Sequence, residues 1–543
     1  MDELTRQSRQ DFSLVLKGGT VIDGSGRPRM EADIGIDGDT IYTVDPKGHL
    51  RGEETLDCRG LIVAPGFIDT HSHSDLMVLS DPSLPMKVRQ GITLEVFGQD
   101  GISVAPVRSA DKPQLRRQLA GLLGDPPLEW NWNSVGEYLS HLERTGAAFD
   151  RGYLVPHGAV RQWVVGSENR PAKNWELRQM VDLVDQGMAE GALGLSTGLI
   201  YPPCCYAETD ELVALCRVVA ARQGVFVVHM RSESDVIVEA VAEMIDVGRL
   251  SGVHVHISHF KIAGQQNWAE IGKVLNMIHE AQTQNIHITA DQYPYIAGST
   301  MLGAILPPWA HDGGVDATRA RLSDPAIRAQ MRQEMARTEK CSWDNFWKWS
   351  GPEGIRIADI PSGRQNDLIG NSLAEAAALR DQDPFEFAFD LLRTENMGVA
   401  MVSFSQSETV VERIMREPYV NVCTDGLLGG KPHPRAFGTY PRILARYVRE
   451  RSILTLEEAI RKMTSQAAQT FRLPGYGAIQ PACHANLVVF DAANVQDEAT
   501  FENPVQYPSH ITHVLVHGDF VVREGLMTGE LPGRVIRSAE VST

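Results

Sequence analysis

The chain has 543 residues, of which 43% are hydrophobic and 22% are charged, the composition of an ordinary soluble globular protein. Its formal net charge of -18 argues against nucleic acid or an anionic membrane surface as a partner. The start shows no signal-peptide pattern, and no apolar run reaches the length of a membrane span. The seven cysteines are scattered without a CxxC pair, which favours a cytoplasmic location.

Short strand patterns separated by turn signals occupy both ends of the chain. Residues 12–17, 20–23, 32–36 and 40–44 are predicted strands, with Gly18 and Gly19 as a turn, and 485–491, 511–518 and 520–523 repeat the pattern. We expect residues 1–60 and 481–543 to form one small β-sandwich domain, with the rest of the chain inserted between its two parts.

The middle of the chain alternates strand and helix patterns. Predicted strands end or lie at 67–69, 93–97, 152–156, 192–196, 225–229, 253–259, 286–291 and 419–425, and amphipathic stretches such as 175–190, 208–223 and 235–251 separate them. Eight strands in this alternation predict an α/β fold, a TIM-like (β/α)8 barrel with its active site at the carboxyl ends of the strands.

One connection is too long for a simple loop. Residues 296–363, directly after predicted strand seven, carry a Pro-rich segment, a charged helical run and three tryptophans. We expect a helical insertion that could act as a lid over the site or serve a purely structural purpose. The barrel is therefore assigned to residues 61–295 and 364–480.

Polar side chains follow the predicted strands at the ends that should form the active site. His71 and His73 are two residues apart at the end of a strand, so their side chains point to the same face. A single histidine at such a place is usually structural, whereas several at one mouth favour a metal site. The further candidates are Asp100, His157, Ser196, Thr197, His229, His259, Asp291, Tyr293 and Asp425.

Imidazole and carboxylate ligands suit a catalytic Zn²⁺. Asp425, at the end of predicted strand eight, fits a general base that accepts a proton from water and returns it to a leaving nitrogen. His157 could support a developing oxyanion.

The segment Pro65 to His73, with the terminal β halves and the terminal-strand Asp425, resembles the amidohydrolase superfamily. More narrowly, the motifs at 194–203, 229–233, 257–261, 291–300 and 425–435 resemble those of the N-acyl-D-amino-acid deacylases, or D-aminoacylases. The resemblance covers almost the whole chain.

This resemblance implies one or two zinc ions per chain. His229 and His259 would hold the tighter ion and His71 and His73 a weaker one, with Asp425 as the catalytic acid and base.

The same resemblance implies how the substrate binds. Lys261, Tyr293 and Arg435 would bind its carboxylate, which an arginine fork and a lysine point charge suit well. Tyr201 would line the pocket for the side chain, and the insertion would correspond to the lid subdomain of the family.

The segment Gly98-Gln99-Asp100-Gly101 departs from the family pattern. The family commonly has a metal-bridging cysteine here, and Asp100 stands in its place. A carboxylate can also bridge two metals, but it shifts the preference towards divalent ions that favour oxygen. We therefore expect Asp100 to be a metal ligand. A divalent metal other than zinc is an alternative at this site.

We predict a zinc-dependent hydrolase of linear amide bonds that converts N-acyl-D-amino acids to a carboxylate and a D-amino acid. A dipeptidase or a hydantoinase-like hydrolase of cyclic amides are alternatives on the same scaffold, and a non-catalytic binding protein is an alternative of another class. The expected partner is a small-molecule substrate, and a homo-oligomer remains open.

Overall fold

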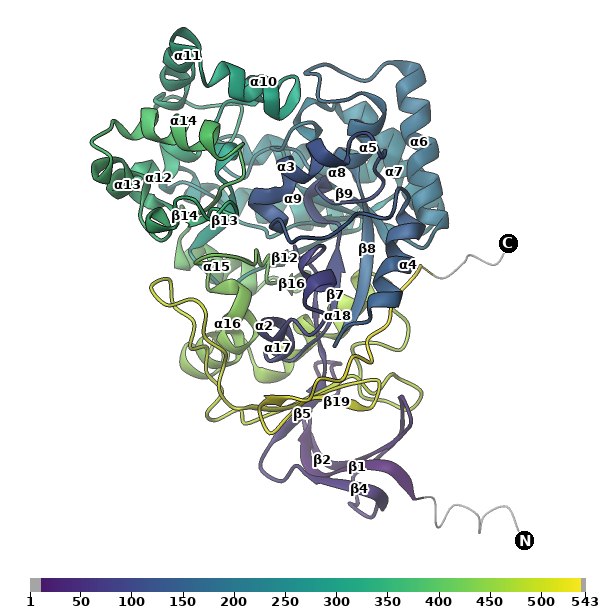
Figure 1. The fold of residues 1–543 in the computed structure, drawn as a ribbon. Helices are drawn as coiled ribbons and strands as arrows, with labels where there is room; N and C mark the ends of the chain where they lie inside the picture. The colour runs from purple at the N-terminus through teal and green to yellow at the C-terminus, as the bar shows by residue number, and fades with distance from the viewer. Residues whose placement is uncertain (1–10, 539–543) are drawn as a thin grey trace.

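The computed structural model describes residues 11–538. Residues 1–10, which bear on the signal-peptide prediction, and residues 539–543 lie outside the described part of the chain. A β domain lies at one end of the molecule, a barrel lies above it, and an inserted subdomain lies beside the mouth of the barrel (Figure 1). Within the described part of the chain, every helix is too short or too polar to cross a membrane.

Strands from both ends of the chain pair into one nine-stranded sheet. The two halves meet where β17 (Leu487–Phe490) pairs antiparallel with β5 (Ile62–Pro65), which in turn pairs parallel with β1 (Phe12–Val21). This confirms the predicted β domain from both ends. The other strands are β2 (Met30–Asp37), β3 (Thr40–Asp45), β4 (Gly52–Asp57), β18 (Ile511–Val516), β19 (Asp519–Arg523) and β20 (Leu526–Met527).

The predicted turn at Gly18 and Gly19 is wrong. β1 continues through both glycines, and its register with β2 shifts between Leu16 and Gly19. Gly18 has a φ of +66°, which favours glycine, so the pair accommodates an irregularity within a long strand.

Eight parallel strands form the predicted barrel, which is confirmed. In order around the sheet they are β6 (Phe67–Asp69), β7 (Ile92–Phe97), β8 (Asp150–Pro156), β9 (Gly194–Gly198), β10 (Val225–His229), β11 (His254–Ile257), β12 (Ile288–Gln292) and β16 (Val420–Val422). The first and last strands meet at their carboxyl ends, where Ser72 bridges Gly426 and the Asp425 N–H donates to the His71 carbonyl at 2.8 Å.

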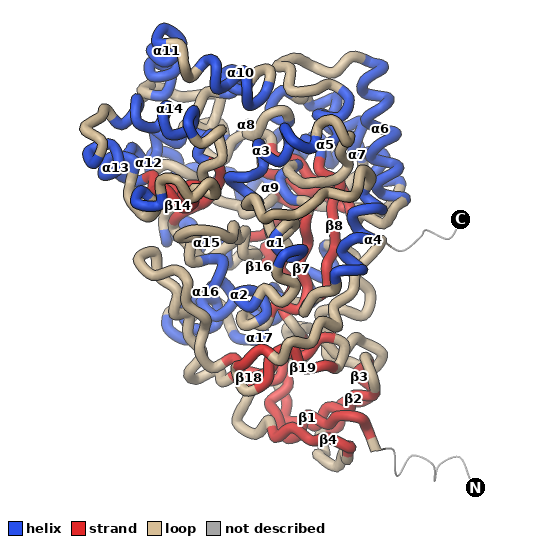
Figure 2. The backbone as a smooth tube through the Cα atoms, in the orientation of Figure 1, coloured by secondary structure: helices blue, strands red, loops and turns tan. Residues whose placement is uncertain are grey.

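Helices surround the barrel strands (Figure 2). In α6 (Asn174–Ala189) the buried residues Met180, Val184 and Met188 are spaced by four, so they form one apolar stripe. The other helices of this layer include α4 (Val135–Thr145), α5 (His157–Val164), α7 (Thr209–Ala221), α8 (Ile237–Ser251), α9 (Ile271–Thr283), α15 (Glu408–Met415), α16 (Arg435–Arg442), α17 (Leu456–Met463) and α18 (Ser465–Thr470). The helices α1 (Met77–Ser80) and α3 (Lys112–Leu123) lie in the segments that follow β6 and β7, and α2 (Pro85–Val88) directly precedes β7.

The insertion is larger than predicted and contains a small sheet. Its three strands are β13 (Ala297–Met301), β14 (Ile355–Asp359) and β15 (Ala400–Phe404), and β15 lies between the other two. The predicted boundary at residue 363 is therefore wrong, because the chain must return as far as Phe404 to complete this sheet. Its helices are α10 (Gly314–Arg321), α11 (Pro325–Met335), α12 (Phe346–Gly354), α13 (Leu373–Leu379) and α14 (Pro384–Thr394), around a separate apolar core.

A buried lysine joins the first and last strands of the barrel below its mouth. Lys87 Nζ lies 2.9 Å from Asp69 Oδ2 and 2.5 Å from Glu95 Oε1. It also donates to Ser72 Oγ at 3.0 Å and Thr424 Oγ1 at 2.8 Å. Both carboxylates and the ammonium group are fully buried, so each depends on the other for compensation.

We predict that Lys87→Met lowers the free energy of unfolding by about 3–5 kcal/mol, because it leaves two buried carboxylates uncompensated. The matched control is Lys340→Met, which removes a pair with Glu239 whose side chains are 61% and 63% exposed and should cost less than about 1 kcal/mol. Urea unfolding of the three proteins measures both values, and equal costs would contradict this role of Lys87.

Candidate metal centre and active site

The carboxyl ends of the barrel strands bring four histidines and two aspartates to one point. Ligand atoms within 4.8 Å of one another define three overlapping sets: His71, Asp100 and His259; His71, His73 and Asp425; and His229, Glu233 and His259. All seven residues are buried. The structure thus brings together every residue that the sequence analysis proposed as a metal ligand.

Asp100 lies between the two pairs of histidines. Its Oδ2 is 3.6 Å from Nε2 of both His71 and His73, and its Oδ1 is 3.5 Å from His259 Nε2. The residue has a φ of +56°, a left-handed conformation that aspartate tolerates better than most residues. Its two oxygens therefore point to different histidines, which is the arrangement a bridging carboxylate needs.

The cluster fits a divalent cation. Buried ring nitrogens of His71 and His229 and the Oδ1 of Asp100 make no hydrogen bond within the described structure. Burial lowers the pKa of His73, but Asp100 and Asp425 outweigh this effect and raise that pKa to about 9. The carboxylates thus attract positive charge to a place where imidazole and carboxylate ligands converge, as zinc-type sites require.

Glu233 lies at the end of the motif at 229–233 and was not among the predicted site residues. Its Oε1 lies 2.6 Å from Lys261 Nζ and 3.1 Å from His259 Nδ1, and its Oε2 lies 3.5 Å from His229 Nε2. Burial raises the pKa of Glu233, but the positive charges of His229 and Lys261 lower it to about 2. Its position four residues after His229 was the available signal.

Asp291 supports the cluster from behind. Its Oδ1 accepts the His259 backbone N–H at 2.5 Å, and its Oδ2 accepts from Thr70 Oγ1 at 2.8 Å and contacts His256 Nε2 at 3.0 Å. The carboxylate therefore fixes the backbone of a candidate ligand. Tyr293, two residues later, does line the cavity, and its hydroxyl accepts from Gln406 Nε2 at 3.0 Å.

Arg435 holds Asp425 in place. Its Nη1 lies 2.9 Å from Asp425 Oδ2, and its Nη2 donates to the Ser299 carbonyl at 2.9 Å. Burial raises the pKa of Asp425, but the Arg435 guanidinium and His259 lower it below its ordinary value. Arg435 is fully buried and lies behind the cavity wall, so a direct contact with a substrate carboxylate stays a prediction.

His157 does not reach the cavity, contrary to its expected position. Its Nδ1 lies 2.8 Å from Thr197 Oγ1 and its Nε2 lies 2.8 Å from Glu211 Oε1, so both ring nitrogens are engaged. The Ser196 hydroxyl is also engaged in a hydrogen bond within the protein, since it accepts the Gly101 N–H at 3.0 Å. These strand-end residues fix the backbone near Asp100, and an oxyanion role for His157 has no geometric basis here.

The catalytic cavity lies over the cluster and has a volume of about 40 Å³. Barrel residues such as His73, Asp100 and Lys261 line one side, and the insertion supplies Phe346 and Trp349 on the other. The buried Nε1 of Trp349 makes no hydrogen bond among the residues that the structure describes. It is therefore an unpaired donor on a residue that lines this cavity.

The insertion is pinned to the loop that carries Glu233. Asp344 accepts from Ser232 Oγ at 2.6 Å, from Ser234 Oγ at 2.7 Å and from the Glu233 N–H at 2.9 Å. Nearby, Lys348 Nζ lies 2.6 Å from an oxygen of Asp235. The wall of the cavity and the orientation of Glu233 therefore depend on the same contacts.

A parallel eight-stranded barrel with a buried histidine and aspartate cluster at its mouth is the architecture of a metal-dependent hydrolase. The chain belongs to the amidohydrolase family, whose family model matches residues 54–522.

Relatives with curated names match over nearly their whole length. The chain is 34% identical over 534 residues to a D-aminoacylase from Alcaligenes xylosoxydans xylosoxydans, covering 98% of this chain and 99% of the relative. It is also 34% identical over 530 residues to an N-acyl-D-glutamate deacylase from the same organism, covering 97% of each.

A solved structure has the same fold. The N-acyl-D-glutamate deacylase from Bordetella bronchiseptica, complexed with zinc and a phosphonate inhibitor that mimics the tetrahedral intermediate, superposes with a TM-score of 0.82. It is 31% identical and covers 97% of this chain and 100% of its own.

We predict that Asp100→Ala reduces the number of zinc ions bound per chain, because this carboxylate faces both pairs of histidines. Metal analysis after dialysis against zinc measures the count. The matched control is Asp39→Ala in the β domain, where Asp39 forms a separate group with His484 and His517 and accepts from Arg534 Nη2 at 2.8 Å. Zinc loss in the control and not in Asp100→Ala would place the metal elsewhere.

We also predict that zinc binding releases protons near neutral pH. His73 and His259, with pKa values raised to about 9 and about 10 against the opposing effect of burial, are protonated at pH 7 and must be neutral to bind a metal. The zinc affinity should therefore rise with pH up to about 9, by about tenfold per unit for each proton displaced. Calorimetry in buffers of different ionisation enthalpy measures the protons, and a pH-independent affinity would contradict the assignment.

Proposed function

We propose that this protein hydrolyses the N-acyl amide bond of N-acyl-D-amino acids to give a carboxylate and a free D-amino acid. The observation that carries the proposal is one cavity that combines a cation-binding histidine and aspartate cluster, a buried carboxylate at Asp425 and an ammonium group at Lys261. Similarity to a D-aminoacylase and to N-acyl-D-glutamate deacylases over the whole chain supports the same reaction.

We propose Zn²⁺ as the metal, with one or two ions per chain. His229 and His259 would hold one ion, His71 and His73 the other, and Asp100 would face both. When bound, zinc polarises a carbonyl and lowers the pKa of water at its open position. The oxygen atoms of Asp100 also leave room for other divalent ions.

In this proposal, Asp425 moves the proton. Its Oδ2 is held by Arg435 Nη1 at 2.9 Å, whereas its Oδ1 faces His73 Nε2 at 3.3 Å and remains at the cavity. In hydrolysis, the oxygen of water bonds to the amide carbon and Asp425 takes the proton. The carbon–nitrogen bond then breaks, and Asp425 returns the proton to the amine nitrogen.

In this proposal, Lys261 binds the α-carboxylate of the substrate. Burial lowers its pKa, but Glu233 outweighs this effect and raises the pKa to about 12, so the side chain stays charged. Tyr293 lies beside it, with Lys261 Nζ 5.7 Å from the centre of the ring. A requirement for a free α-carboxylate would favour this reaction over hydrolysis of a cyclic amide.

We place the protein in the cytoplasm, acting on a small-molecule substrate. The seven cysteines are all free, six of them buried, which suits a reducing compartment. The acidic net charge of -18 does not suit a nucleic-acid partner.

We predict that Asp425→Asn lowers kcat on N-acetyl-D-amino acids by about 10²- to 10⁴-fold, because the asparagine side chain cannot accept the proton. The zinc content should be retained, so activity and metal are measured on the same sample. Asp185→Asn, at a side chain 49% exposed on α6, serves as the matched control and should behave as the wild type. Unchanged turnover in Asp425→Asn would contradict the proposed role of this residue in proton transfer.

A further inference from the structure

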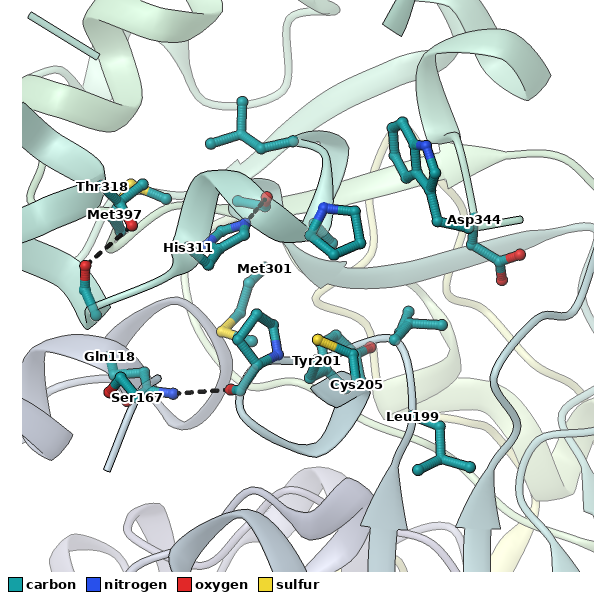
Figure 3. Close-up of a pocket in the computed structure, with 18 of the residues that line it drawn as sticks. Gln118, Ser167, Leu199, Tyr201, Cys205, Met301, His311, Thr318, Asp344 and Met397 are labelled. Atoms are coloured by element: carbon teal, nitrogen blue, oxygen red, sulfur yellow. Dashed lines mark hydrogen bonds between the residues drawn. The ribbon is translucent and has the colours of Figure 1, made fainter. Parts of the chain in front are cut away.

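A second, larger cavity adjoins the catalytic one. Its volume is about 170 Å³, against about 40 Å³ for the catalytic cavity, and Tyr201 and Phe346 line both. It lies between the loop after β9 and the insertion, with Leu199, Tyr201 and Cys205 below and His311 and Asp344 on the insertion side (Figure 3). A substrate bound over the metal cluster could therefore extend a group past Tyr201 into this space.

The walls of this cavity are mainly apolar. The apolar side chains that line it include those of Leu199, Ile200, Met301, Leu306, Val315 and Met397. An apolar cavity of about 150 Å³ is large enough to hold benzene. The space therefore accommodates a group of the size of a leucine or phenylalanine side chain.

The arginine and the aspartate that line the cavity, Arg231 and Asp344, already have partners within the protein. Arg231 donates to both carboxylate oxygens of Glu243 at 2.9 and 3.0 Å and to the carbonyls of Cys205 at 3.2 Å and Ala207 at 3.0 Å. Asp344 is used by Ser232, Ser234 and the Glu233 N–H, as described above. Neither leaves a charge free to meet an ionised ligand.

Three further polar side chains of the lining, His311, Gln118 and Thr318, form hydrogen bonds within the protein. His311 is paired through Nε2 with the Gly303 carbonyl at 3.1 Å, and burial lowers its pKa to about 4, so it is uncharged at neutral pH. Gln118 donates to the Pro202 carbonyl at 3.2 Å, and Thr318 donates to a carbonyl of its own helix (Figure 3).

We propose that this neutral cavity binds an apolar substituent of the substrate, so that the protein prefers N-acyl-D-amino acids with aliphatic or aromatic groups over acidic ones. The proposal rests on the function proposed above and narrows it. A carboxylate placed here would lose its hydration without gaining a cation, which is strongly unfavourable. The equal identity of 34% to a D-aminoacylase and to a D-glutamate deacylase does not decide between these classes, whereas the chemistry of the cavity does.

Two parts of such a substrate could supply the apolar group, namely the amino-acid side chain or the acyl chain. A panel of substrates with the zinc-loaded full-length protein separates them. It consists of N-acetyl-D-alanine, N-acetyl-D-leucine, N-acetyl-D-phenylalanine, N-acetyl-D-glutamate and N-octanoyl-D-alanine. The side chain is the source if kcat/KM is higher for N-acetyl-D-leucine and N-acetyl-D-phenylalanine than for N-acetyl-D-alanine. The acyl chain is the source if kcat/KM is higher for N-octanoyl-D-alanine than for N-acetyl-D-alanine.

We expect kcat/KM for at least one apolar substrate to exceed that for N-acetyl-D-glutamate by about 10- to 200-fold, the discrimination typical of an apolar pocket. Preference for N-acetyl-D-glutamate would overturn the inference and leave the proposed function intact. Failure to hydrolyse any member of the panel would overturn the proposed function itself, so the two failures are distinguishable.

A variant that fills the cavity tests its location. Ala304 lines the cavity and is only partly buried, so Ala304→Phe projects a ring into the space. We expect the ratio of kcat/KM for the preferred apolar substrate to that for N-acetyl-D-alanine to fall about tenfold or more. The matched control is Ala378→Phe at an exposed position of α13 in the same subdomain, which should keep the ratio. An unchanged ratio in a folded, active Ala304→Phe protein would overturn the assignment.

Discussion

The attraction between buried carboxylates and the four histidines at the barrel mouth is the interaction on which the site depends. Asp100, Glu233 and Asp425 are all buried, and a buried anion is stable only with a compensating partner. Lys261 and Arg435 each pair with one of these carboxylates, whereas the Asp100 carboxylate faces His71, His73 and His259. The position between Asp100 and the histidines is therefore the place for a bound cation.

The fold supplies this arrangement through the closure of the barrel. His71 and Asp425 follow the first and last strands, and the contact between their backbones fixes the Asp425 carboxylate beside the histidine cluster. Lys87 lies directly below and ties Asp69 to Thr424 on the other side of the same seam. The insertion supplies one wall of the catalytic cavity, with Asp344 holding the Glu233 loop and Phe346 lining both cavities.

The barrel and the four histidines of the site could be predicted from the sequence. Barrel strands are continuous apolar runs, and their carboxyl ends lie at the same end of the barrel. His71, His73, His229 and His259 follow such runs directly, so their convergence follows from the fold. The extent of the insertion could not be predicted, since β15 resembles any other buried strand until its partners β13 and β14 are known.

The direction in which individual side chains point could not be predicted from the sequence either. His157 follows β8 as His229 ends β10, yet its ring turns away from the cavity to Glu211. Glu233 and Arg435 are charged residues in loops or at a helix start, where spacing does not reveal that one holds Lys261 and the other Asp425. The neutrality of the second cavity likewise depends on pairs such as Arg231 with Glu243, which only the structure shows.

The most direct measurement is anomalous X-ray diffraction at the zinc edge from crystals of the zinc-loaded protein. We predict a peak between Asp100, His229 and His259, and at full occupancy a second peak between Asp100, His71 and His73. Peaks confined to other positions, such as the group of Asp39, His484 and His517 in the β domain, would contradict it.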